Sequence, residues 1–141
     1  MHRRVMVFGT FDGLHEGHRD LFAQAKRHGD TLIVIVARDT TVEKVKGRKP
    51  RAEENERLAA VKMDASVSDA YLGNTGEVYQ VITDHKPDTI CLGYDQQAFT
   101  AELADWLVKQ YRSIPIIRLT AFHPDKYKSS LLRERAKQAN K

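Results

Sequence analysis

Short apolar runs alternate along this chain with longer stretches in which apolar residues recur at helical spacing, and no other feature limits the possible folds as strongly. The apolar runs predict strands at 5–8, 32–37, 70–72, 89–93 and 115–117. The longer stretches predict helices at 16–28, 53–63, 76–85, 101–110 and 129–138. Strands that alternate with helices of this length are typical of βαβ units. We therefore expect an α/β fold: a Rossmann-like, doubly wound sheet of about five parallel strands with helices on both faces.

The size and composition of the chain suit a single compact domain over residues 1–141. The longest apolar run, 32–37, is far shorter than the roughly 20 residues of a membrane span, so we expect no membrane partner. The N-terminal residues lack the apolar core of a signal peptide. Because Cys91 is the only cysteine, no internal disulfide can form, and we expect a cytoplasmic location.

The net charge of +4 suits a partner that carries phosphate, which is either a nucleic acid or a small molecule. The basic residues gather in two separate segments, 44–51 and 126–135, and do not form one continuous stripe. We therefore expect small-molecule substrates and no nucleic acid. The sequence leaves open whether the chain acts as a monomer or as a homodimer.

The most informative segment is 9–18, Gly-Thr-Phe-Asp-Gly-Leu-His-Glu-Gly-His, which follows the first predicted strand and opens the first helix. A helix start presents free backbone N–H groups and favours anions. Gly9 is expected to let the backbone approach a phosphate, and Gly17 to keep the first helical turn free of bulk. His15 and His18 are three residues apart, so we expect both imidazoles to project from one face and donate to polyphosphate oxygens.

Other interpretations of this segment are solvent exposure of the two histidines or a zinc site. Zinc would need further ligands, and the remaining histidines are scattered, with no cysteine pair. The segment is neither a Walker A loop nor a Gly-x-Gly-x-x-Gly dinucleotide loop. It therefore predicts a phosphate-binding loop of another kind, at the carboxyl edge of the sheet.

The motif Gly-Thr-Phe-Asp followed by His-x-Gly-His resembles the signature of the cytidylyltransferase-like nucleotidyltransferases. That superfamily includes glycerol-3-phosphate cytidylyltransferase, phosphopantetheine adenylyltransferase and the archaeal-type FAD synthases. Segments 38–50 and 92–96 resemble the archaeal FAD synthase (FMN adenylyltransferase) group in particular. Segment 127–133 resembles the C-terminal Ile-Ser-Ser/Thr-Thr-x-x-Arg motif of the superfamily.

This resemblance implies an enzyme that moves an NMP group from an NTP to a phosphate-bearing acceptor and releases pyrophosphate, with Mg²⁺ bound to the nucleotide phosphates. It implies catalytic roles for His15, His18, Lys44 and Arg133. It implies nucleotide-binding roles for Gly9, Thr10, Phe11, Asp12, Gly17, Lys46, Gly93, Asp95, Lys128, Ser129 and Ser130. No residue is expected to be a resident metal ligand.

Several of these residues also have a plainer interpretation. Lys44 and Lys46 are expected in a loop after the second strand, where they either reach phosphates or belong to a solvated basic segment. Asp12 either contacts Mg²⁺, ribose or base, or stabilises its own turn. Arg57 either fills a family position or pairs on the helix surface with Glu53.

The last predicted helix begins at Ser129 and Ser130, where one serine serves as the N-cap and the same helix start is expected to hold the β- and γ-phosphates. Trp106 and Tyr111 are expected in the core. Cys91 lies within an apolar run and is expected to be buried packing and not a nucleophile.

The leading hypothesis from the resemblance is an FMN adenylyltransferase that converts ATP and FMN to FAD and pyrophosphate. The alternative is a cytidylyltransferase acting on glycerol 3-phosphate or another sugar or polyol phosphate. A second alternative is a non-catalytic nucleotide-binding sensor. A flat flavin would need apolar or aromatic walls. The candidates for those walls are Tyr94, Phe99, Phe122 and Tyr127.

Overall fold

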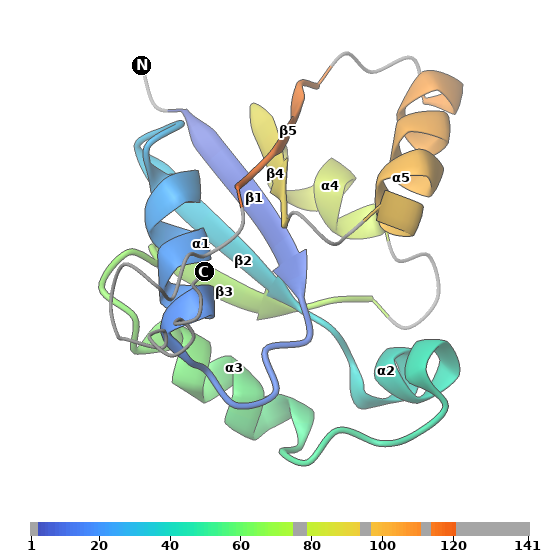
Figure 1. The fold of residues 1–141 in the computed structure, drawn as a ribbon. Helices are drawn as coiled ribbons and strands as arrows, with labels where there is room; N and C mark the ends of the chain where they lie inside the picture. The colour runs from blue at the N-terminus through green and yellow to red at the C-terminus, as the bar shows by residue number, and fades with distance from the viewer. Residues whose placement is uncertain (1–2, 75–78, 94–96, 111–113, 121–141) are drawn as a thin grey trace, which may run out of the picture.

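A parallel sheet forms the centre of the molecule in a computed structural model that describes residues 3–74, 79–93, 97–110 and 114–120 (Figure 1). The sheet in this part of the chain has five strands in the order β3-β2-β1-β4-β5. The strands are β1 (Arg4–Gly9), β2 (Thr31–Val36), β3 (Asp69–Leu72), β4 (Thr89–Leu92) and β5 (Ile116–Arg118). Neighbouring strands pair in parallel throughout, with Val7 of β1 opposite Val34 of β2 and Cys91 of β4. The α/β fold predicted from the sequence is confirmed.

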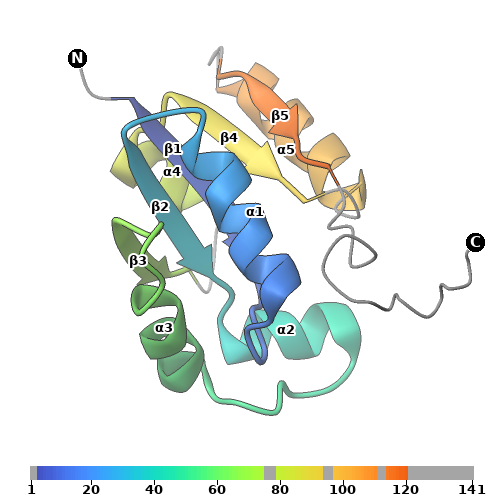
Figure 2. The ribbon, with the colours of Figure 1, turned by 60° about the vertical axis from the view of Figure 1, so that its left-hand side comes forward.

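Helices cover both faces of this sheet, as Figures 1 and 2 show. The described helices are α1 (Glu16–Lys26), α2 (Asp39–Lys46), α3 (Glu54–Lys62), α4 (Gln80–His85) and α5 (Gln97–Lys109). Helices α1 and α3 pack on one face and α4 and α5 on the other, while α2 lies beyond the carboxyl ends of β1 and β2. The predicted helix at 129–138 lies outside the described residues.

The strands are apolar on both faces because each face is covered. Along β1, Val5 and Val7 pack in a cluster with Phe22 of α1 and Val61 of α3. The alternate strand positions, such as Met6, pack in a second cluster with residues of α4 and α5. Trp106 of α5 packs at the edge of this second cluster, as expected of a core residue, and Tyr111 lies outside the described residues.

One expectation about the fold was wrong: Lys44 and Lys46 do not lie in a loop, because residues 39–46 form α2. The helix is hard to detect because β-branched residues lower its propensity and only Val42 is buried. Its boundary signals are nevertheless in the sequence. Asp39 lies in the first turn, and Gly47 ends the helix in the left-handed conformation with φ of 77°.

The order of the strands sets where a ligand is expected. Connections leave β1 in one direction toward β2 and β3, and the chain later returns on the other side of β1 to form β4 and β5. The topological switch point therefore lies between the carboxyl ends of β1 and β4. Residues 9–18, which we call the signature loop, begin at the carboxyl end of β1.

The chain just after β5 is hydrogen-bonded to α1, the helix that begins in the signature loop. The side-chain amide of Gln24 in α1 accepts from the backbone N–H of Thr120 (3.1 Å) and donates to the Thr120 carbonyl (3.1 Å). This pairing uses both main-chain polar groups of one residue, as a strand neighbour would. It fixes the chain after β5 against α1.

Candidate functional site

The two histidines of the signature loop form the N-terminal cap of α1. His15 is the N-cap residue, and its Nδ1 accepts from the backbone N–H of Gly17 (3.0 Å). The backbone N–H of His15 in turn donates to Nδ1 of His18 (3.3 Å). This is the reciprocal arrangement of a capping box, built here from two imidazoles where Ser or Thr and Glu or Gln usually serve.

The cap determines which nitrogen of each ring carries the proton. Because Nδ1 of both His15 and His18 accepts a backbone N–H, the proton of each neutral ring is on Nε2. The rings are stacked, with centroids 3.9 Å apart and planes 24° apart. The prediction that both imidazoles project from one face is confirmed, and the pair presents two N–H donors at the helix N-terminus.

Phe11 lies between the two histidines and the apolar core. Its side chain is 4% exposed, and its ring lies edge-on to His18 at a centroid distance of 5.3 Å and against Phe22 at 5.3 Å. Its backbone is left-handed, with φ of 56°, which is unusual for a bulky side chain and is found mostly where packing enforces it. The Phe11 side chain therefore belongs to the core, and a contact between its backbone and a nucleotide stays a prediction.

Gly9 has a structural reason that the sequence did not indicate. A Cβ at Gly9 would lie 2.5 Å from Cζ of Phe11, so the missing side chain makes room for the folded-back ring, while the approach of a phosphate to this backbone stays a prediction. The sequence did not show this because the ring reaches Gly9 only through the left-handed turn at Phe11.

Asp12 joins the signature loop to the segment after α2. Its carboxylate accepts from the backbone N–H groups of Arg51 (2.7 Å) and Ala52 (3.0 Å). These two hydrogen bonds favour the charged form and lower the pKa of Asp12 below its ordinary value. Asp12 thus clamps two loops together instead of stabilising its own turn, while a contact with ribose, base or Mg²⁺ stays a prediction.

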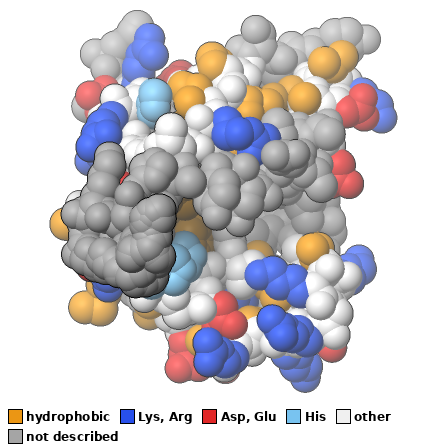
Figure 3. Space-filling model, in the orientation of Figure 1, with side chains coloured by type: hydrophobic (Ala, Val, Ile, Leu, Met, Phe, Trp, Pro, Cys, Tyr) orange, Lys and Arg blue, Asp and Glu red, His pale blue; other side chains and the backbone are white. Residues whose placement is uncertain are grey.

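The segment clamped by Asp12 is rich in cations. We call residues 47–53 the basic loop, since exposed Arg48, Lys49 and Arg51 lie in it. Lys44 and Lys46 are exposed on α2 just before it and not in a loop as expected. Lys46 lies one turn after buried Val42 on the same face of α2, whereas Lys44 does not lie on that face. Figure 3 shows Lys and Arg side chains gathered at this end of the molecule.

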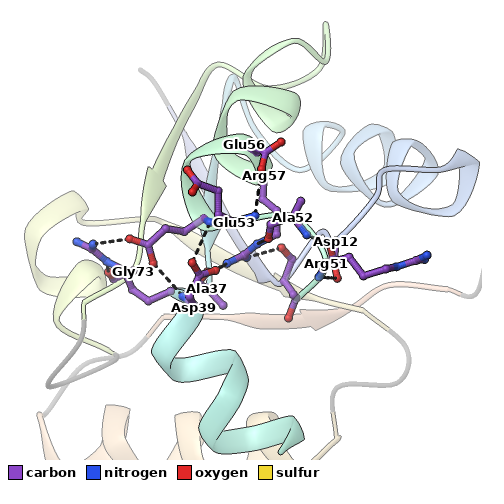
Figure 4. Close-up of polar contacts among 12 residues, drawn as sticks. Asp12, Ala37, Asp39, Arg51, Ala52, Glu53, Glu56, Arg57 and Gly73 are labelled. Atoms are coloured by element: carbon purple, nitrogen blue, oxygen red, sulfur yellow. Dashed lines mark hydrogen bonds and ion pairs between the residues drawn. The ribbon is translucent and has the colours of Figure 1, made fainter. Parts of the chain in front are cut away.

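Arg57 of α3 is the largest fully buried side chain that carries a charge, with 1% of its surface exposed. Its guanidinium donates to the carbonyls of Thr10 (2.9 Å), Ala37 (2.7 Å) and Ala52 (3.0 Å). It also pairs with the Asp39 carboxylate at 2.6 Å (Figure 4). Of the two interpretations of Arg57, the surface pair with Glu53 is therefore wrong.

Sequence reasoning left Arg57 undecided between a family position and a surface pair, because arginines in charged helices are mostly exposed. A signal was available: Arg57 precedes Val61 by four residues, and residues at this spacing share a helix face. Val61 is completely buried, so the helical pattern places Arg57 on the inner face.

Helices α2 and α3 cap each other at their first residues. The backbone N–H of Asp39 donates to Glu54 Oε1 (2.9 Å), and the backbone N–H of Glu54 donates to Asp39 Oδ2 (3.3 Å). Both carboxylates thereby lie at positive helix ends. Arg38 extends the network, because it pairs with Glu54 (3.2 Å) and donates to the Gly73 carbonyl (2.7 Å) at the end of β3. The main chains that follow β1, β2 and β3 are thus joined by one polar network.

Comparison with known families decides the assignment: residues 6–135 match the family described as cytidylyltransferase-like. The chain belongs to this family. It is accordingly a nucleotidyltransferase, as the signature loop predicts.

Relatives of similar length share much of the sequence. A FAD synthase from Thermoplasma volcanium is 38% identical over 132 residues, which cover 94% of this chain and 92% of that protein. A FAD synthase from Korarchaeum cryptofilum is 43% identical over 136 residues, which cover 94% of this chain and 91% of that protein. A solved structure described as a lipopolysaccharide core biosynthesis protein from Thermoplasma volcanium superposes with a TM-score of 0.81 at 38% identity, covering 87% of this chain and 100% of that one.

On the β4 side of this cytidylyltransferase-like site, the structure describes fewer of the expected residues. Gly93 follows β4 directly, and its carbonyl accepts from Arg118 (3.0 Å). Outside the described residues lie Asp95, Lys128, Ser129, Ser130 and Arg133, together with Tyr94, Phe122 and Tyr127. Nothing is described of the Phe99 side chain.

Cys91 is buried in β4, and burial raises the pKa of its thiol to about 11. A thiolate nucleophile is therefore disfavoured, which agrees with the packing role expected from the sequence.

Within the described residues, no group of three or more His, Cys, Asp or Glu side chains is arranged to hold a metal ion. Among the helices of the same residues, none is both long and apolar enough to span a membrane.

Proposed function

We propose that this protein transfers AMP from ATP to the phosphate of FMN, forming FAD and releasing pyrophosphate. The observation that carries the reaction class is the stacked pair His15 and His18, whose Nε2 atoms are donors at the N-terminus of α1. The choice of FMN rests on relatives named FAD synthase that match nearly the whole chain.

The transfer reaction requires alignment of the two reactants and neutralisation of charge more than it requires proton transfer. A phosphomonoester has a second pKa of about 6, so an FMN phosphate oxygen is already anionic at neutral pH and needs no general base. That oxygen forms a bond to the α-phosphorus of ATP while the bond to the departing pyrophosphate breaks. Holding the two reactants in line supplies much of the acceleration.

In this proposal the Nε2–H groups of His15 and His18 donate to phosphate oxygens of ATP, where negative charge accumulates during transfer. The backbone N–H groups at the start of α1 add a favourable dipole. Lys46 and the basic loop, which Asp12 joins to the signature loop, supply further cations. Mg²⁺ bound to the nucleotide phosphates would neutralise further charge. Arg133 and Lys128 are proposed to hold the remaining phosphates.

The engagement of the Asp12 carboxylate in the signature loop supports this assignment. Asp12 is directed to the N–H groups of Arg51 and Ala52. Because the Asp12 charge is engaged by main-chain donors, it offers less repulsion to an incoming polyphosphate.

The test is a product assay with purified protein, Mg²⁺, either ATP or CTP, and either FMN or glycerol 3-phosphate. We expect FAD and pyrophosphate from ATP with FMN, and little product in the other combinations. The glycerol 3-phosphate arm matters because the signature loop resembles that of the cytidylyltransferases as well as that of the FAD synthases. CDP-glycerol formation with FMN untouched would show that the acceptor is wrong. Nucleotide binding without any product would indicate a sensor.

A further inference from the structure

We infer that Arg57 is a positioning residue for the transfer reaction, because its buried guanidinium sets the separation of the signature loop and the basic loop. The catalytic part of this inference rests on the proposed function, whereas the structural part does not. Arg57 itself is 1% exposed and beneath both loops, so it acts through them and not by touching substrate.

The guanidinium joins segments that are far apart in sequence. Its Nη1 donates both to Thr10 in the signature loop and to Ala37 after β2. Its Nε donates to Ala52 in the basic loop. The five N–H donors of arginine form a rigid planar fork, whereas lysine has three donors on one flexible ammonium. Lysine therefore cannot hold all of these carbonyls in the same positions.

The peptide groups of Ala52 are held from both sides. Its N–H donates to Asp12 of the signature loop, and its carbonyl accepts from Arg57. Arg57 also reaches Thr10, two residues before Asp12. These contacts close a ring of hydrogen bonds that passes through both loops and α3 (Figure 4). The cations of the basic loop are thereby fixed relative to the helix start that carries the histidines.

The charge of Arg57 is balanced inside this ring. Asp39 lies 2.6 Å away and is held in place by the N–H of Glu54. A buried charge that loses its partner is strongly unfavourable, and buried carbonyls that lose their donor are too. Loss of any of these contacts is therefore costly, and a change in the guanidinium should displace the loops.

Val61 provides a matched control. It lies one turn after Arg57 on the same face of α3 and is completely buried, but it packs only in the apolar cluster beneath the sheet. Val61→Ala lowers stability without removing any bond to the loops. Arg57→Lys keeps the charge and removes the fork.

The first measurement is amide hydrogen exchange, which needs no activity. Each protein is measured at a temperature the same number of degrees below its own melting temperature. We expect Arg57→Lys to raise exchange in residues 10–18 and 47–53, whereas Val61→Ala leaves these segments close to wild type. Equal exchange of the two loops in both variants would overturn the inference.

The second measurement is steady-state kinetics with ATP and FMN. We expect Arg57→Lys to lower kcat on the order of 10- to 100-fold, because misplacement of catalytic groups by about 1 Å has effects of that size. KM for ATP should change much less, and Val61→Ala should keep the wild-type kcat. A folded Arg57→Lys variant with wild-type kcat would overturn the inference.

Two further arms keep the result interpretable. If Arg57→Lys does not fold, Asp39→Asn replaces it, since it keeps every guanidinium bond to a carbonyl. It removes the balancing charge and places an NH2 group where one of the two acceptor oxygens was, opposite either Arg57 Nη2 or the Glu54 N–H. Asp39→Asn should lower kcat by a smaller factor than Arg57→Lys. Unchanged amide hydrogen exchange in the two loops together with unchanged kcat would count against the inference. If the wild type makes no FAD, the proposed function fails, while hydrogen exchange still decides the role of Arg57.

Discussion

Beyond the carboxyl ends of β1, β2 and β3 the chain is held by hydrogen bonds between side chains and main chain, whereas α4 and α5 are held to the sheet by apolar packing. Asp12, Arg57 and Glu54 connect the loops of the first region. Ile82 and Leu103 are completely buried in the second. Hydrogen bonds fix direction and distance, while apolar burial is non-directional. The region that must aim donors at phosphates is thus the one built from directional contacts.

The apolar region should show the largest loss of stability. Leu103→Ala in α5 removes a completely buried side chain and should lower the free energy of unfolding by about 2–5 kcal/mol. Urea unfolding measures this loss. Because Leu103 is far from the loops in sequence and packs in the second cluster, kcat of the folded variant should stay near wild type. A large loss of kcat would show that the two regions are not separable.

The loop region should show the opposite response when a histidine is removed. His18→Ala deletes one of the two stacked donors, and loss of such a donor typically lowers the rate on the order of 100-fold or more. The melting temperature should change little, since His18 is partly exposed and caps a single N–H. His28→Ala, at the other end of α1, is the control. Retained activity with a lowered melting temperature would make His18 a packing residue.

The Asp12 clamp should make stability depend on pH. Its pKa in the folded protein is lowered from an ordinary value of 3.8, so it contributes stability above that value and loses it as the pH falls through the lowered pKa. Asp12→Asn should lower stability at pH 7 by roughly 1 kcal/mol. The difference between wild type and variant should shrink at pH 3. A difference that is equal at both pH values would contradict the charged clamp.

A similarly small effect is expected where a hydrogen-bonded link lies outside the loop region. Gln24→Ala removes the pairing with Thr120 and should lower stability by about 1 kcal/mol. Amide exchange should rise in residues 114–120 and stay unchanged in the signature loop. Asp30→Ala, which removes a single contact to the Arg3 N–H at the other end of the sheet, is a suitable comparison.

The sequence predicted the elements whose apolar pattern is strong and the site residues that lie in one motif. The strands at 5–8 and 32–37 were found because burial on both faces makes them apolar throughout. Helix α2 was missed because only Val42 in it is buried. His15 and His18 were found because local spacing alone brings them together.

Contacts that depend on the tertiary fold could not be predicted. Asp12 meets Ala52 across 40 residues, and Arg57 meets Thr10 across 47. No local pattern specifies which backbone group a side chain reaches over such distances. The left-handed turn at Phe11 is similar, since its cause is packing against Gly9 and Phe22 and not a propensity of phenylalanine.

The ring through Asp12, Ala52 and Arg57 has a consequence for how this site can vary. At Ala52 and Thr10 the ring uses main-chain atoms, which nearly every amino acid supplies. Divergent sequences can therefore exchange Ala52 and still inherit the same loop geometry. Proline at position 52 is the exception, because it removes the N–H that Asp12 accepts. In an engineered library, position 52 should tolerate bulky, polar and charged residues and be depleted of proline.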